Sequence, residues 1–127
     1  MNIKSLDHLV LTVQNIAASC EFYQAVMGME KIVFGEGRVA LKFGLQKINL
    51  HEYGNEFEPK ANSSVPGSAD LCFISDTPIE DVMNQLQAHG VEVIAGPVQR
   101  TGACHPIMSV YFRDPDGNLI EISNEII

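Results

Sequence analysis

Two residues that could do chemistry, His8 and Asp70, stand at equivalent points of a near repeat in this chain of 127 residues. Each opens an apolar run that leads into a helix-like segment ending at a glycine, Gly28 in the first half and Gly90 in the second. Both pairs are separated by 62 residues. Imidazole and carboxylate groups can move protons or bind a metal ion, so the pair could converge on one site. Either group could instead only form hydrogen bonds in polar surroundings.

A second pair of equivalent positions lies near the end of each half, where the offset grows to 72 residues and matches Asn49 with Glu121. Strand alternation places His51 on the same face as Asn49. The larger offset is explained by the segment 97–106, for which we expect no counterpart in the first half. We expect that segment to be a loop, whose Arg100 could bind a carboxylate in bidentate fashion or simply be solvated.

The elements that must position these residues follow the same order in both halves. Asn15 is a suitable N-cap for a helix over 16–27, and Gly28 can end it. Thr77, Pro78 and Glu80 form a capping-box pattern at the start of the second helix, which His89 and Gly90 close. Alternation and turn signals predict strands over 8–13, 30–34, 38–43, 47–52, 71–75, 91–94, 108–112 and 119–123.

Composition restricts the class of protein and the class of partner. The length suits one domain, and no apolar run approaches the roughly 20 residues needed to cross a bilayer. Three widely spaced cysteines, with Cys20 and Cys72 expected in the core, indicate reduced thiols and a cytoplasmic protein that does not bind membranes. The net charge of −8 would repel phosphate backbones, so we do not expect a nucleic acid partner.

The residues at 6–13, 22–29 and 111–121 resemble the vicinal oxygen chelate superfamily, which includes glyoxalase I, bleomycin resistance proteins and extradiol dioxygenases. The stretches 43–52 and 100–103 are most similar to the glyoxalase domain-containing protein 5 group and its bacterial relatives named virulence proteins. The resemblance implies an α+β fold of two βαβββ modules whose curled mixed sheet surrounds a central cavity. The modules would span 1–52 and 69–127 of a single domain, joined by a linker over 53–68.

The resemblance also implies a metal site, because family members take ligands from the first and last strand of each module. The corresponding positions here are His8, Asn49, Asp70 and Glu121. We expect His8, Asp70 and Glu121 to bind a divalent ion of zinc, nickel, manganese, iron or cobalt. Asp70 could instead orient His8 or cap backbone amides, and His51 could replace the ligand lost at Asn49.

The remaining site residues follow from their types and their positions in the chain. Glu121 is the expected catalytic carboxylate, with Glu52 and Asp70 as further candidates for the base. We expect Asn49, His51 and Arg100 to contact the substrate.

Three functions are compatible with this chemistry. The first is a metal-dependent lyase or isomerase of glyoxalase type, acting on a small metabolite with vicinal oxygens or a 2-oxo or 2-hydroxy acid through a metal-stabilised enediolate. The second is a metal-free protein that binds a small, antibiotic-like molecule. The third is an extradiol dioxygenase using His8, His51 and Glu121. Small members of the superfamily often dimerise, so we expect a homodimer, with modules paired within one chain or between chains.

Overall fold

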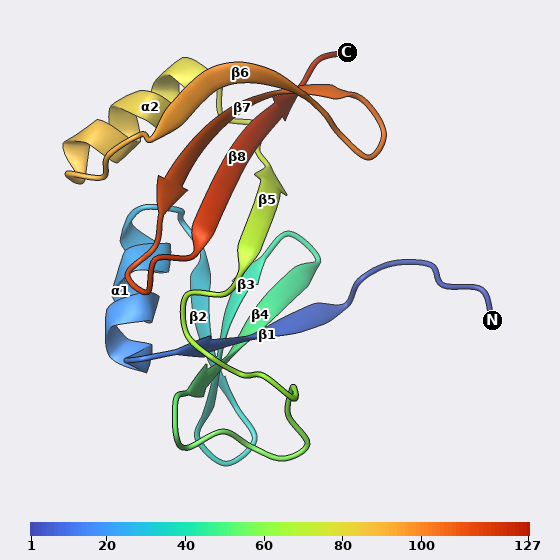
Figure 1. Ribbon diagram of the computed structural model, residues 1–127, viewed down its shortest axis with the longest axis vertical. Coiled ribbons are helices and arrows are strands. Elements are labelled where there is room, and N and C mark those ends of the chain that lie inside the picture. Colours follow the sequence, from blue (N-terminus) through green and yellow to red (C-terminus); the bar gives the residue numbers. More distant parts are fainter. The chain divides into compact units, whose positions relative to one another are not determined.

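The first half of the chain folds into a helix and a four-stranded sheet (Figure 1). The computed structural model describes residues 1–127 and divides them into two units, Met1–Gly67 and Ser68–Ile127. In the first unit the sheet order is β1-β4-β3-β2, with β1 parallel to β4 and the other pairs antiparallel. Its elements are β1 (His8–Val13), α1 (Ile16–Ala25), β2 (Glu30–Phe34), β3 (Arg38–Phe43) and β4 (Gln46–Glu52).

The second unit repeats this plan with the order β5-β8-β7-β6, in which β5 is parallel to β8. Its elements are β5 (Asp70–Ile74), α2 (Ile79–Ala88), β6 (Ala95–Thr101), β7 (Pro106–Arg113) and β8 (Leu119–Glu125). The predicted pair of βαβββ modules is therefore confirmed. The hydrogen bonds define two mixed sheets, one in each module, and not one continuous sheet.

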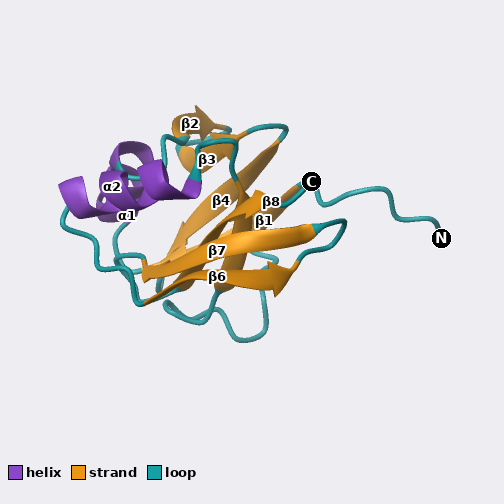
Figure 2. Ribbon diagram, turned by 90° about the horizontal axis from the view of Figure 1, so that it is seen from above, coloured by secondary structure: helices purple, strands orange, loops and turns teal.

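Each unit has its own core between one face of its sheet and its helix (Figure 2). In the first unit, Leu41, Ile48 and Leu50 lie on the face of the sheet opposite Asn49 and His51 and are fully buried. In the second unit, Val110, Phe112 and Ile120 are likewise buried, and α2 packs on β7 and β8. Alternation in the strands leaves the other face of each sheet for polar side chains. Neither helix is long and apolar enough to span a membrane.

The helix starts show one prediction confirmed and one that is wrong. The side chain of Asn15 accepts a hydrogen bond from the Ala18 N–H at 2.9 Å, so Asn15 is the N-cap of α1 as predicted. Helix α2 has no side-chain cap from Thr77, and the capping box is absent. Asn124 of β8 replaces it: its Oδ1 accepts from the Ile79 N–H at 2.8 Å, and its Nδ2 donates to the carbonyl groups of Ser75 and Thr77. A residue 45 positions away caps this helix.

The segment before β7 also differs from the prediction. Residues 91–94 form no strand, whereas 95–101, most of which was expected to be a loop, form β6. Strand β6 occupies the position in its sheet that β2 occupies in the first sheet, so the part of the segment that lies in β6 has a counterpart in the first half. Pro97 is tolerated because β6 lies at the edge of the sheet. A Cβ on Gly96 would lie 2.3 Å from the Ser109 carbonyl oxygen, so only glycine fits this bulge between the strands.

Candidate functional site

The polar face of the first sheet carries His8, Asn49 and His51. The parallel register pairs His8 with Lys47 and places Asn49 and His51 on the same face, two and four residues further along β4 than Lys47. Neighbouring β3 presents Ala40 beside Asn49. Glu52, by the same alternation, lies off this face, so the geometry does not favour it as a base.

His8 lies at the start of β1 with its side chain exposed. Its Nδ1 atom lies 2.8 Å from Oδ2 of Asp7, and this hydrogen bond and the adjacent imidazole lower the pKa of the Asp7 carboxyl. The carboxylate orients the ring and leaves Nε2 free. A carboxylate bound to one ring nitrogen is the usual support for a histidine that binds metal through the other.

Asn49 and His51 are almost completely buried, at 5% and 3% exposure. The Oδ1 atom of Asn49 and both ring nitrogens of His51 have no hydrogen-bond partner. Burial, reinforced by the charge of Arg38, lowers the pKa of His51, so its ring is neutral in the folded protein at neutral pH. Leaving such groups unpaired costs free energy, which favours a ligand that would bind them.

In the second unit, Glu121 lies in the centre of the polar face. Its register neighbours are Cys72 on β5 and Tyr111 on β7. Ser123 donates to Glu121 Oε2 at 3.4 Å, and its Oγ lies 2.7 Å from Oγ of the buried Ser109. The carboxylate is half-buried and accepts this one hydroxyl.

Asp70 and Cys72 share this face, because they are two residues apart on β5. Asp70 is exposed and pairs in register with Leu119. Cys72 was expected in the core, and that expectation is wrong: the residue is exposed and its Sγ lies 3.4 Å from Ser123 Oγ. Its spacing from Asp70 could have revealed this position. Partial desolvation of the Sγ atom by its neighbours in the sheet raises the pKa of Cys72, which keeps the thiol protonated. Cys20 is buried as predicted.

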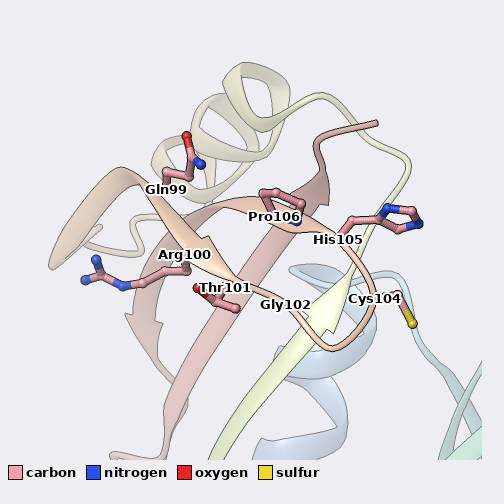
Figure 3. Close-up of a pocket in the computed structure, with 7 residues that line it drawn as sticks. All are labelled: Gln99, Arg100, Thr101, Gly102, Cys104, His105 and Pro106. Atoms are coloured by element: carbon pink, nitrogen blue, oxygen red, sulfur yellow. The ribbon is translucent and has the colours of Figure 1, made fainter.

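Arg100 lies on β6 and not on a loop. Its Nε donates to the Tyr111 hydroxyl at 3.1 Å, so it reaches the residue next to Glu121 in the sheet. The sequence pattern does not mark Tyr111 as a site residue. The hairpin that follows contains a surface pocket of about 470 Å³, lined by Gln99, Arg100, Thr101, Gly102, Cys104, His105 and Pro106. Figure 3 shows Arg100 and His105 pointing away from each other, so this pocket does not gather them into a site.

The sequence and the fold are similar to those of known proteins. The profile of the Glyoxalase/Bleomycin resistance protein/Dioxygenase superfamily matches residues 5–122. The chain belongs to this superfamily. It is 55% identical to virulence protein STM3117 of Salmonella typhimurium, over 99% of this chain and 88% of that protein. It is 59% identical to integron cassette protein VCH_CASS1 of V. cholerae, with a TM-score of 0.96 over 98% and 97% of the two chains.

Proteins that are less similar to this chain have named activities. Metallothiol transferase FosB of Staphylococcus haemolyticus is 30% identical over 94% of this chain and 83% of that protein. Lactoylglutathione lyase of Agrobacterium tumefaciens and the antibiotic-binding protein TnmS3 of Streptomyces are 23% and 21% identical, with TM-scores of 0.74 and 0.76, and so show the shared fold alone. The superfamily thus includes enzymes.

The donor types suit the divalent metals that superfamily members use. His8 offers a free imidazole nitrogen with a carboxylate behind it, while Asp70 and Glu121 offer carboxylates on an accessible polar face. The structure contains no cluster of three or more His, Cys, Asp and Glu side chains that could hold a metal ion. The ligand set His8, Asp70 and Glu121 stays a prediction.

Proposed function

We propose that this protein is a divalent-metal-dependent lyase or isomerase of glyoxalase type that acts on a small oxygenated metabolite. The single observation that carries the proposal is the bond of 2.8 Å between His8 Nδ1 and Asp7, which leaves the other nitrogen of an exposed imidazole free to bind a metal. We propose Asp70 and Glu121 as the further ligands. Superfamily membership supports this assignment, since FosB is named as a metallothiol transferase.

The metal, when bound, would supply the Lewis acidity that stabilises negative charge on two adjacent substrate oxygens. The protein's own residues would do the rest. Glu121 would accept the proton from the carbon next to those oxygens, and Ser123 would hold its carboxylate in place. Tyr111 lies beside Glu121 and is anchored by Arg100, so the pair would orient the substrate.

The test follows proton exchange, which an enediolate mechanism requires. Hydroxypyruvate, a 2-oxo acid with a neighbouring hydroxyl, would be incubated in D₂O with the full chain as purified, and deuterium at C3 would be followed by NMR. We expect exchange well above the uncatalysed rate and its loss in Glu121→Gln. Glu92→Gln is the matched control, because Glu92 is an exposed glutamate between α2 and β6, outside the strands that form the polar face. Equal exchange in the Glu121→Gln variant would refute the catalytic role.

A metal-free binding protein is the second candidate. It is favoured by the unpaired polar atoms of Asn49 and His51, which could recognise a small molecule without any metal. Tight binding of a small molecule after complete metal removal, with no proton exchange under any metal loading, would support this candidate over the enzyme.

A further inference from the structure

Arg38 is a cation without a carboxylate partner on the polar face of the first sheet. It follows the β2–β3 turn and pairs in register with Phe34. Its guanidinium carbon lies 5.3 Å from the centre of the Phe34 ring and 4.6 Å from that of Phe57. None of the salt bridges in the structure involves Arg38. The protein as a whole carries a net charge of −8, so an arginine left without an acidic partner is notable.

The acidic side chain of Glu56, in the segment that also carries Phe57, already has hydrogen-bond and charged partners. Glu56 accepts the Gly54 N–H with both carboxylate oxygens, at 2.8 and 3.1 Å, and lies 3.9 Å from Lys60 Nζ. Lys47 adds a second cation to the Phe34 ring, with its Nζ at 3.9 Å from the ring centre. The face therefore has a surplus of positive charge around one aromatic residue.

Buried hydrogen-bonding groups lie next to this cation. Val39 of β3 pairs with Leu50 of β4, so the next residues on the two strands, Arg38 and His51, lie beside each other on the polar face. The centroid of the His51 ring lies 5.6 Å from that of the Phe57 ring. Both of its nitrogens and the Asn49 Oδ1 lack partners, although both residues are at least nine-tenths buried. A neutral imidazole has one N–H to donate, so His51 can complete the coordination of an anion held by Arg38.

We propose that Arg38 and His51 form a binding site for the carboxylate of a small organic acid. The two aromatic rings pack on the guanidinium group and leave the N–H groups at its edges free to donate hydrogen bonds to a planar anion. Two parallel N–H donors match the two oxygens of a carboxylate. This inference rests on the proposed function and specifies its substrate class as a 2-oxo or 2-hydroxy acid. The half-exposed Phe57 lies over both residues and must shift for the anion to reach His51.

The test measures pyruvate binding by calorimetry, with the full chain both as purified and after metal removal. Methyl pyruvate, an uncharged ester, is the ligand control. We expect Arg38→Gln to weaken pyruvate binding about tenfold or more and Arg38→Lys to lose less, as expected for loss of a charge-assisted bidentate bond. Lys31→Gln, on the opposite face of β2, removes the same charge and should bind as the wild type does.

Equal affinity of Arg38→Gln and Lys31→Gln, equal affinity for pyruvate and its ester, or no binding of pyruvate would overturn the proposal. Thermal unfolding of each variant verifies that it is folded. Binding of pyruvate to the metal-free protein does not depend on catalysis. If the wild type binds pyruvate but catalyses no proton exchange, the proposed reaction alone is refuted. If proton exchange occurs but Arg38→Gln binds pyruvate as the wild type does, this site alone is refuted.

Discussion

The Phe57 ring lies edge to face on the His51 ring, with centroids 5.6 Å apart and an angle of 69° between the planes. Phe57 belongs to the segment after β4, whose backbone is tied to β1 by the bond from the Tyr53 N–H to the Val13 carbonyl. His51 is therefore covered by a residue of the segment expected to be a linker. This contact keeps an unpaired imidazole buried and neutral, and it makes the stability of the protein dependent on pH.

The first prediction concerns that pH dependence. The pKa of His51 is lowered below its ordinary value of 6.5, so below pH 6.5 the unfolded chain binds more protons than the folded protein. The contribution of His51 to the free energy of unfolding should be constant above that value and fall as the pH decreases below it, until the folded-state pKa is passed. His51→Phe should remove this part of the decrease, as measured by urea unfolding at a series of pH values.

The same variant should be at least as stable as the wild type at pH 8, because it removes the unpaired nitrogen atoms. The lowered pKa of Glu56 gives a further loss of stability in acid, which should start below its ordinary value of 4.5 and persist in the variant. An unchanged slope between pH 6.5 and 5 in His51→Phe would contradict the assignment.

The second prediction concerns the cap of α2. Asn124→Ala should lower the free energy of unfolding by about 2–3 kcal/mol, because it removes three hydrogen bonds to buried or half-buried backbone groups. Asn84→Ala, at an exposed position of α2, is the control and should change stability by less than about 0.5 kcal/mol. Chemical denaturation measures both, and equal effects would mean that Asn124 is not the cap.

The third prediction compares two glycines with positive φ. Gly90→Ala meets no neighbouring atom and should cost about 1 kcal/mol from backbone strain alone. Gly96→Ala adds a clash with the Ser109 carbonyl oxygen and should cost clearly more, about 2 kcal/mol or above. Thermal unfolding would show which variant is less stable. A larger loss of stability in Gly90→Ala than in Gly96→Ala would contradict the close approach of β6 to β7.

The fourth prediction tests the support of His8. Asp7→Ala should weaken divalent metal binding by about 10–100-fold, because it removes the carboxylate that orients the imidazole ring. Competition with a metal-sensitive dye measures the affinity. Glu92→Ala removes an equal charge at an exposed position and should leave the affinity unchanged. A similar loss of metal affinity in both variants would mean that Asp7 contributes only its negative charge and does not orient His8.

The repeat in the sequence predicted most of the fold because its signals are local. Alternating residues located seven of the eight strands to within two residues at either end, and a side chain three positions from its partner capped α1 as predicted. The errors arose where distant residues decide the structure. Glycine and proline at 96 and 97 indicated a loop, but the close approach of Ser109 and the edge position make them part of β6. The cap from Asn124 to α2 likewise depends on tertiary contacts.

The candidate site was predictable only in part for the same reason. Strand alternation correctly grouped Asn49 with His51, since both lie on one strand. It could not show that Phe57 covers His51 or that Arg38 lies without a partner between two aromatic rings, because those contacts join different segments. The position of Cys72 beside Glu121 was accessible from alternation, but the residue type favoured the core.

Elemental analysis of the purified full chain tests directly whether His8 and Glu121 bind a divalent metal. We expect a stoichiometric divalent ion in the wild type and its loss in His8→Ala and Glu121→Ala. We expect the ion to be retained in His105→Ala, because His105 lies on the exposed β6–β7 hairpin. Absence of metal from the wild type even after incubation with each candidate ion, or equal metal content in all three variants, would contradict metal binding by His8 and Glu121.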